Sequence, residues 1–275
     1  MSGSLAIDEV TLSKGELYTF ITSKHAGQRS GTLVACIQGT RAEEIISRGK
    51  IIPEGKRMRV KEISMDMAPS MKLAASTLFP QARIVTDRFH VVRLVIDAVQ
   101  QIRIDYRKKE IEAENREITL CRKSKRPYNP KRYDNGDTRK ELLARSRYLL
   151  YHFPKKGTKH QQKRAKILFR EYPKLKLAYS LAIAFRKIYE TRTIQSARRL
   201  FGKWYKKVAQ SNLEEFNSVV NSIKNHFETI LNFFFDRSTN AFAESFNAKI
   251  KLFRANLRGV TNQKFFLFRL EKLFA

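Results

Sequence analysis

The stretch RVKEISMDMAPSMKLAASTLFPQARIVTD, residues 59–87, decides the fold because it reads as strand, helix and strand. Residues 59–66 and 82–87 have the length and apolar content of strands. Residues 68–79 have a helical pattern, with Pro69 in the first turn, where proline is tolerated. Two strands joined by a helical crossover lie parallel in one sheet. We therefore predict an α/β fold.

The residues before this stretch predict three more strands and a helix. Residues 5–12 and 16–23 read as strands joined by a tight turn at Gly15. Residues 31–37 are apolar on both faces, which favours a strand inside the sheet. Residues 40–49 read as a short helix that ends in glycine. The predicted order is strand, strand, strand, helix, strand, helix, strand.

After the last of these strands the pattern becomes helical. Two prolines and an Asn-Gly pair in residues 123–137 predict a loop, ordered or not. The main runs with helical periodicity are residues 93–118, 166–172, 174–190, 194–209 and 213–234.

The charge of the chain is its strongest compositional signal. Its 55 Lys and Arg residues face 26 Asp and Glu residues, a net charge of +29 with a pI near 10.3. Nucleic acid is the partner that this excess favours, ahead of an anionic membrane surface. No apolar run reaches the roughly 20 residues that span a bilayer, and the first residues do not resemble a signal peptide. Cys36 and Cys121 are too few for a disulfide framework or a zinc knuckle, so we expect a cytoplasmic protein.

Part of the charge is concentrated in residues 103–170, which hold 22 Lys and Arg against 8 acids. This segment is either a solvated helical surface or an arm that contacts phosphates. The second reading makes four residues in or before the predicted loop candidate DNA contacts: Arg122, Lys123, Lys125 and Arg126.

A polar row near the end of the chain raises a question of function. Steps of three and four residues place its members on one helix face: Asn240, Glu244, Asn247 and Lys251. Ser238 and Thr239 precede the row as potential helix caps. The row is either the solvated side of an amphipathic helix or part of a site to which Glu244 brings a carboxylate.

Two further carboxylates belong to predicted strands. Asp8 stands among apolar residues, a costly position unless the charge is paired or bound to a cation. Asp66 ends the strand 59–66, where it acts either as a site residue or as a helix cap. With Glu244 they form an oxygen-only set, which suits magnesium or manganese and not zinc. Two such ions are the usual device for in-line displacement at phosphorus, so the set points to phosphoryl transfer on DNA or RNA.

Three blocks of sequence carry a resemblance to a known family. The chain resembles bacterial insertion-sequence DDE transposases of the ISL-three type, and the DRFHVV segment is the most specific match. The blocks are AIDEVTLSKGELYTFI, ISMDMAPSMKLAASTLFPQARIVTDRFHVVRL and STNAFAESFNAKIKLFRANLRGVTNQKFFLFRL.

The resemblance implies a ribonuclease H-like mixed sheet with a large all-helical insertion before the last catalytic helix. It implies a catalytic triad of Asp8, Asp66 and Glu244, two Mg²⁺ or Mn²⁺ ions, and double-stranded DNA as the partner of a homo-oligomer at the bacterial nucleoid. The expected parts are residues 1–89 for the first part of the core, 90–236 for the insertion and 237–275 for the C-terminal helices that complete the core.

The chain departs from the family pattern at its start. Family members usually begin with a zinc-binding segment and a helix-turn-helix, whereas this sequence starts at the first catalytic strand. We therefore expect weak recognition of element ends. Two alternatives to a transposase remain: an inactive or truncated nucleic-acid-binding remnant, and a plain nuclease of the same fold.

Several residues compete for or support these roles. Asp87 ends the fifth strand and is the rival for the second acid, while His90 is either a positioning residue, a metal ligand or a structural histidine. Glu9 must face away from Asp8 because successive strand residues alternate. Trp204 is either buried or available to stack on an unpaired base. Asn240 and Asn247 lie one turn on either side of Glu244, and their amides are expected to hydrogen-bond its carboxylate or a nearby phosphate. Lys251 is expected to meet the DNA backbone.

Overall fold

The computed structural model describes residues 3–12, 15–24, 31–153, 157–237, 240–257 and 262–275. Residues 238–239, expected to cap a helix, lie outside the described residues. The chain divides into two compact units. Unit 1 comprises Met1–Val91 and His226–Ala275, and unit 2 comprises Val92–Asn225. The last fifty residues therefore join the first ninety in one compact body.

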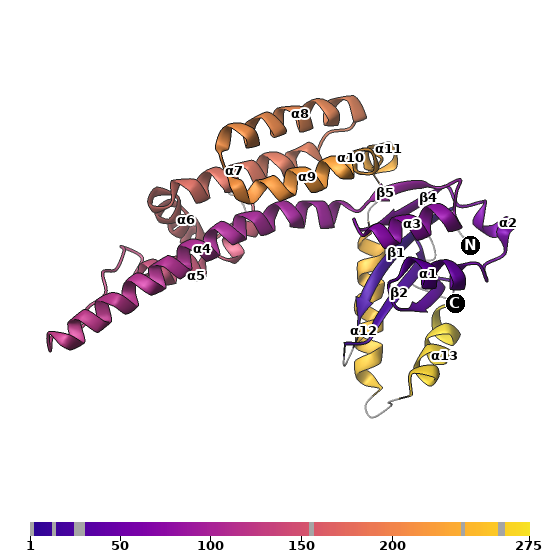
Figure 1. Cartoon of the computed structure of the whole chain (residues 1–275), viewed down its shortest axis with the longest axis horizontal. Coiled ribbons are helices and arrows are strands. Elements are labelled where there is room, and N and C mark those ends of the chain that lie inside the picture. Colours follow the sequence, from indigo (N-terminus) through magenta and orange to yellow (C-terminus); the bar gives the residue numbers. More distant parts are fainter. Residues whose placement is uncertain (1–2, 13–14, 25–30, 154–156, 238–239, 258–261) are drawn as a thin grey trace. The chain divides into compact units, whose positions relative to one another are not determined.

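Unit 1 contains a mixed sheet of five strands in the order β3-β2-β1-β4-β5 (Figure 1). β1 pairs antiparallel with β2 and parallel with β4, so it is the central strand. β2 and β3 are antiparallel, and β4 and β5 are parallel. The predicted α/β class and the order of elements are confirmed. The strands are β1 (Ser4–Thr11), β2 (Leu17–Ser23), β3 (Leu33–Gln38), β4 (Glu62–Met65) and β5 (Arg83–Thr86).

Helices cover both faces of this sheet. One face packs Leu5, Ile7 and Ile63 against α1 (Ala42–Gly49) and α3 (Pro69–Leu78). The other face packs Val10 and Phe20 against α12 (Ala241–Asn256) and α13 (Gln263–Phe274). Because side chains alternate along a strand, β1 contributes odd-numbered residues to the first core and Asp8 to the α12 side. The short helices of unit 1 are α2 (Glu54–Arg57), α10 (Phe227–Leu231) and α11 (Phe233–Asp236).

The third strand lies at an edge of the sheet, so its predicted interior position is wrong. β3 pairs only with β2 among the described strands. It is apolar on both faces because both faces are covered: Val34 and Ala35 pack toward α1 and α3, and Leu33 and Cys36 toward α12 and α13. An apolar strand therefore indicates two covered faces and not two neighbouring strands. Cys36 belongs to this core, and burial raises the pKa of its thiol to about 12.

Unit 2 is helical. Its core centres on Trp204, which is 2% exposed and lies between Phe185 and Phe216. The Trp204 Nε1 donates to the Leu181 carbonyl oxygen at 3.0 Å, which ties α8 to α7. Figure 1 shows these two helices side by side. The elements are α4 (Arg88–Lys123, which begins in unit 1), α5 (Arg139–Arg145), η2 (Tyr148–Tyr151), α6 (Lys159–Glu171), α7 (Pro173–Ile188), α8 (Ile194–Ser211), η4 (Glu214–Phe216) and α9 (Asn217–Asn225).

The predicted single helix over residues 213–234 is wrong, because the chain forms four short helices there: η4, α9, α10 and α11. Breaks fall at His226 and Asn232, which both flank helices without a side-chain cap. Within unit 1, the Asn232 amide donates to the Ile84 carbonyl oxygen of β5 at 2.8 Å. The Thr229 hydroxyl lies 2.7 Å from that of Thr86. These bonds to β5 favour the broken path over a continuous helix.

The predicted loop at residues 123–137 is ordered by a buried carboxylate. Asp137 is fully buried and accepts a hydrogen bond from Arg164 Nε at 2.8 Å and another from Arg145. Its neighbour Thr138 then caps α5 with a capping box.

No helix in the described part of the chain is long and apolar enough to cross a membrane.

Candidate functional site

Asp8 and Asp66 stand level with one another on neighbouring parallel strands. The register pairs Ala6 of β1 with Ser64 of β4. Two residues further along each strand lie Asp8 and Asp66, so the same register places them side by side. Even spacing from Ala6 and Ser64 also puts both on one face of the sheet.

Asp87 lies beside Asp66, directly after the end of β5, the third parallel strand. The register pairs Met65 of β4 with Thr86 of β5, and the Asp87 backbone N–H donates to the Met65 carbonyl oxygen at 2.7 Å. The next residues along are Asp66 and Asp87. Three carboxylates thus stand in a row: Asp66 and Asp87 directly follow β4 and β5, and Asp8 lies beside them inside β1. The carboxyl ends of parallel strands are where open α/β sheets bind ligands.

The helix α12 brings two asparagines to this row. Asn247 Nδ2 donates to Asp8 Oδ2 at 2.5 Å. At the start of the helix, the Ser64 hydroxyl donates to Asn240 Oδ1. These two bonds tie one helix to two neighbouring strands, and they fix the helix turn between them, which carries Glu244.

The row of polar residues on α12 is not a solvated face throughout. Asn240 and Asn247 are 4% and 9% exposed, whereas Glu244 and Lys251 are exposed. The solvated reading is therefore wrong for the two asparagines, which satisfy side chains of the sheet. Spacing alone did not exclude it, although Asn247 lies beside the buried apolar stripe of Phe246 and Ile250.

The carboxylates interact electrostatically. Burial raises the pKa of the Asp8 carboxyl above its ordinary value, and the charges of Asp66 and Asp87 add to this, while His90 opposes it. Burial also raises the pKa of Asp87, against the backbone N–H of Phe89 and the charge of His90. Partial desolvation raises the pKa of Glu244, and Asp87 is the carboxylate that adds to it. A cation at this edge would relieve the shared repulsion.

The two rivals for the second acid differ in their hydrogen bonds. Asp66 Oδ1 accepts a hydrogen bond from the backbone N–H of Ala68 at 2.8 Å. Ala68 is the N-cap residue of α3, and its own side chain makes no capping hydrogen bond. Asp87 is 4% exposed, and its Oδ2 has no hydrogen-bond partner among the described residues. His90 Nε2 lies 3.9 Å from that oxygen, beyond hydrogen-bond distance. Asp66 therefore keeps one carboxylate oxygen for a ligand, whereas Asp87 has a buried carboxylate oxygen without a hydrogen-bond partner among the described residues.

This donor set fits a hard divalent cation. All its donors are carboxylate or amide oxygens, and a second buried oxygen, Asn247 Oδ1, also lacks a partner among the described residues. The described residues do not hold a preassembled cage, because no three His, Cys, Asp or Glu side chains among them are arranged to ligate one ion.

The other residues singled out from the sequence lie apart from this row. Glu9 is exposed, as strand alternation requires. Trp204 belongs to the core of unit 2, which confirms the buried alternative over stacking on a base. The four loop cations and Lys251 are all exposed: Arg122, Lys123, Lys125 and Arg126 surround the end of α4.

Sequence reasoning missed Ser64 and an ion-pair cluster. Ser64 stands two residues before Asp66 on the same face, and period-two spacing would have placed it beside the site. Glu62, 5% exposed, pairs with Lys24 at 3.2 Å and Arg83 at 3.5 Å at the opposite ends of the parallel strands. No local pattern indicates that cluster, because Lys24, Glu62 and Arg83 are far apart in the sequence.

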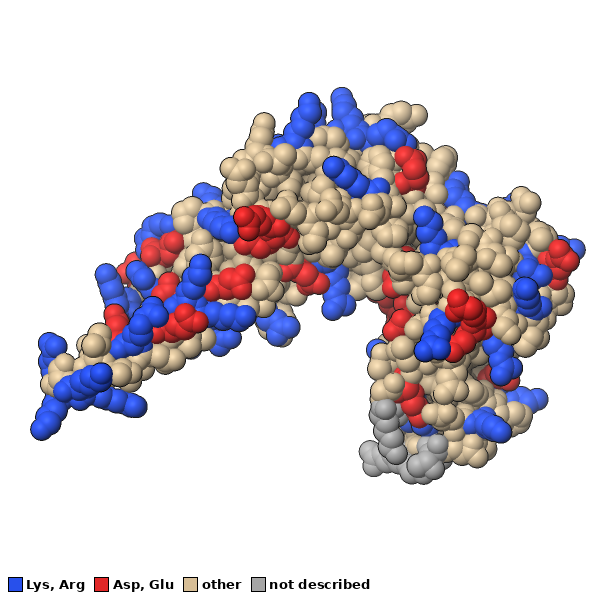
Figure 2. All heavy atoms as spheres, viewed as in Figure 1, with Lys and Arg blue, Asp and Glu red and all other residues tan. Residues whose placement is uncertain are grey.

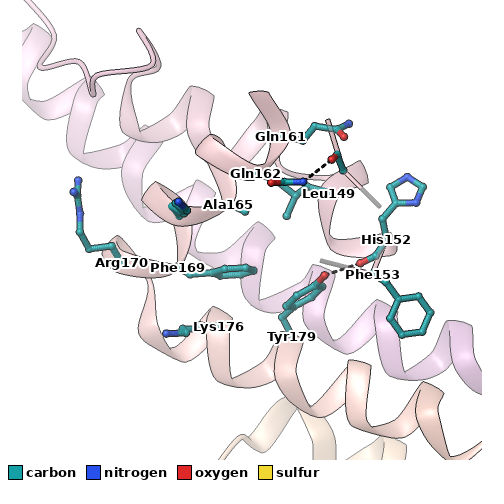
Figure 3. A pocket seen from close by; sticks show the side chains of 12 residues that line it. Leu149, His152, Phe153, Gln161, Gln162, Ala165, Phe169, Arg170, Lys176 and Tyr179 are labelled. Carbon is teal, nitrogen blue, oxygen red and sulfur yellow. Dashed lines mark hydrogen bonds between the residues drawn. The ribbon is translucent and has the colours of Figure 1, made fainter. Parts of the chain in front are cut away.

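A separate cavity of about 750 Å³ lies in unit 2, between η2, α6 and α7 (Figure 3). Phe169 and Tyr179 stack at 5.1 Å in its wall, and the Tyr179 hydroxyl donates to the His152 carbonyl oxygen at 2.6 Å. Its described lining contains no carboxylate, so it offers no site for the chemistry considered above.

A mixed sheet with a row of acids and a strongly basic surface is typical of enzymes that act on nucleic acids, and the comparisons with known proteins narrow the class. A family model described as Transposase, of the ISL3 type of DDE transposases, matches residues 5–270. The chain belongs to this transposase family.

A curated relative is the transposase for insertion sequence element IS1001 of Bordetella parapertussis. It is 23% identical over 271 residues, which is 98% of this chain. The chain spans 60% of that relative's length. No solved structure matches the chain.

Proposed function

We propose that the chain is the catalytic part of a DNA transposase with a ribonuclease H-like core. It cleaves DNA strands at insertion-sequence ends and joins the freed 3′-hydroxyl to target DNA. The observation that carries the proposal is the level row of Asp8, Asp66 and Asp87 with the Asn247 amide on Asp8, in a member of a transposase family. The excess of positive charge supports DNA as the substrate.

We assign the ligand roles to Asp8, Asp66 and Glu244. Bound Mg²⁺ or Mn²⁺ would make the attacking oxygen more acidic and neutralise the leaving oxygen. Asn247 fixes the Asp8 carboxylate in one orientation through its 2.5 Å hydrogen bond. Asn240 anchors the start of α12 on Ser64, which sets where Glu244 lies one turn later. Asp87 and His90 act as positioning residues beside the row.

The assay that tests this function follows the fate of DNA ends. The chain is mixed with Mg²⁺, labelled DNA that carries candidate inverted repeats, and target plasmid. Cleaved and joined products support the transposase. Cleavage without joining would indicate a plain nuclease. DNA binding without cleavage in Mg²⁺ or Mn²⁺ would indicate a remnant that binds nucleic acid and has lost the chemistry.

A further inference from the structure

The helix α8 has two faces of different character. Its buried residues are Ala197, Phe201, Trp204 and Val208, which recur at steps of three and four and pack into the core of unit 2. With 3.6 residues per turn, the opposite side of this 18-residue helix is the one that faces solvent.

All charged residues on the solvent face of α8 are cations. The helix contains no Asp or Glu. Figure 2 shows Lys and Arg atoms projecting along the edge of unit 2 above α8. The exposed cations, here called the α8 cationic face, are Arg198, Arg199, Lys203, Lys206 and Lys207.

These cations differ from those of the neighbouring long helix. On α4, Arg93 pairs with Asp97 at 3.6 Å, and Glu114 of the same helix pairs with Lys140 at 2.7 Å. In the described part of the chain, no carboxylate pairs with Arg199, Lys203, Lys206 or Lys207. An ordinary solvated helix face mixes both signs of charge, so these four cations of the α8 cationic face carry an excess of positive charge that a polyanion would neutralise.

Gly202 lies in the middle of the α8 cationic face, one turn from Arg198 and one turn from Lys206. Glycine weakens a helix interior, and neither packing nor backbone conformation explains it here. A Cβ at this position would meet no atom within 4 Å, and the residue is not among those with positive φ. The missing side chain leaves room for a ligand to approach the helix backbone.

We propose that the α8 cationic face, with Gly202 at its centre, is a docking surface for the phosphate backbone of double-stranded DNA. Residues 198–207 extend about 14 Å along the helix axis. That length matches about four nucleotides of one strand at about 3.4 Å each. Contacts of this kind position DNA without reading its sequence. The inference goes beyond the catalytic proposal and shares with it only the premise that DNA is the ligand.

Charge removal with a matched control tests the surface. The variant combines Lys203→Gln, Lys206→Gln and Lys207→Gln in the full chain. Its affinity for duplex DNA of random sequence, measured by fluorescence anisotropy, should fall at least roughly tenfold, and its log–log salt slope should flatten by up to about 2.7. The control removes the same charge at exposed residues of unit 1: Lys50→Gln, Lys56→Gln and Lys61→Gln. Equal losses in both variants would mean a general field effect and would overturn the proposal.

A second pair of variants tests close approach at constant charge. Gly202→Gln adds a long side chain where DNA should lie, and should weaken binding roughly tenfold, the size of one lost charge-assisted contact. Gly202→Ala adds one methyl group and should bind like the unchanged protein. Thermal melts should show both variants folded, because glutamine and alanine favour helix more than glycine does. Unchanged DNA affinity in Gly202→Gln would contradict the role of Gly202.

The outcomes separate this surface from the catalytic site and from a membrane. If the triple variant lost DNA affinity while the unchanged protein cleaved nothing, the surface would stand and the catalytic proposal would fail. If the triple variant bound DNA normally while the unchanged protein cleaved it, the surface proposal would be wrong and the catalytic proposal would stand. If the triple variant lost affinity for anionic vesicles but not for DNA, the proposal would be overturned in favour of a membrane-binding face.

Discussion

Asp8 occupies a position that costs stability when its carboxyl is ionised. Burial and the neighbouring charges of Asp66 and Asp87 raise its pKa, so the folded protein holds the proton more tightly than the unfolded chain. Stability conferred by the protonated form is complete below the unfolded pKa, and it is lost as pH rises through the folded one. Asp8→Asn removes the ionisation, so its Tm should exceed that of the unchanged protein near neutral pH, and the two Tm values should converge below about pH 4.

Calorimetric melts at both pH values check this prediction. Asp134→Asn, a change at an exposed carboxylate, serves as the control and should leave Tm nearly unchanged. A lower Tm for Asp8→Asn near neutral pH would mean that the ionised carboxylate stabilises the fold. In that case the ionised Asp8 would carry no stability cost that points to a function.

The two rivals for the second acid should separate by the size of their effects. Asp66→Asn should lower the rate of DNA cleavage by at least about a thousandfold, as expected when a catalytic group is lost. Asp87→Asn should cost only about tenfold to a hundredfold, as supporting residues around metal ligands do. Single-turnover cleavage rates measure both. The reverse order would assign the ligand role to Asp87, whose buried oxygen lacks a partner among the described residues.

At the scale of elements, α8 is held by its tryptophan. Trp204 is 2% exposed, lies 4.9 Å from Phe185 between ring centroids, and donates to the Leu181 carbonyl oxygen. Trp204→Ala should lower the free energy of unfolding by about 3–5 kcal/mol. Trp204→Phe should cost less and leave DNA affinity unchanged, because the indole does not reach a ligand. Urea unfolding and anisotropy measure the two effects, and a loss of DNA affinity in a folded Trp204→Phe would restore the stacking role.

The elements that the sequence predicted well are those with short, local signals. The strand–helix–strand stretch at residues 59–87 became β4, α3 and β5, because turn residues and apolar runs bound each element. The edge position of β3 was not predictable, since apolarity reports covered faces and α13 comes from the far end of the chain. The breaks at His226 and Asn232 depend on bonds to β5 about 140 residues earlier, which periodicity does not contain.

The candidate site was predictable as a list of residues and not as an arrangement. An acid inside an apolar strand pointed to Asp8, the end of a predicted strand to Asp66 and the polar row to Glu244, and the family resemblance implied the same three residues. The bond from Asn247 to Asp8 spans 239 positions, and the level of Asp87 with Asp66 depends on strand register. Such long-range facts follow from packing, so Asn247 and Asp87 could be named from the sequence while their contacts could not.

At the scale of the whole chain, the net charge of +29 predicts strongly salt-dependent DNA binding. Each neutralised phosphate contributes a slope of about 0.9 on a log–log plot. Replacing the exposed cations Arg122, Lys123, Lys125 and Arg126 by glutamine should flatten that slope by up to about 3.6 if each residue contacts a phosphate. Anisotropy titrations over a range of salt concentrations measure it, and an unchanged slope would show that this end of α4 does not touch DNA.

The central claim is that the carboxylate of Asp8 takes part in cutting DNA, and strand cleavage by two neighbouring variants tests it most directly. Asp8→Asn and Glu9→Gln each remove one negative charge from adjacent residues of β1 that face opposite sides of the sheet. With labelled duplex and Mg²⁺, we predict that Asp8→Asn loses at least about a thousandfold in cleavage rate while its DNA affinity is unchanged, and that Glu9→Gln cleaves like the unchanged protein. Cleavage by Asp8→Asn at the unchanged rate would contradict the account.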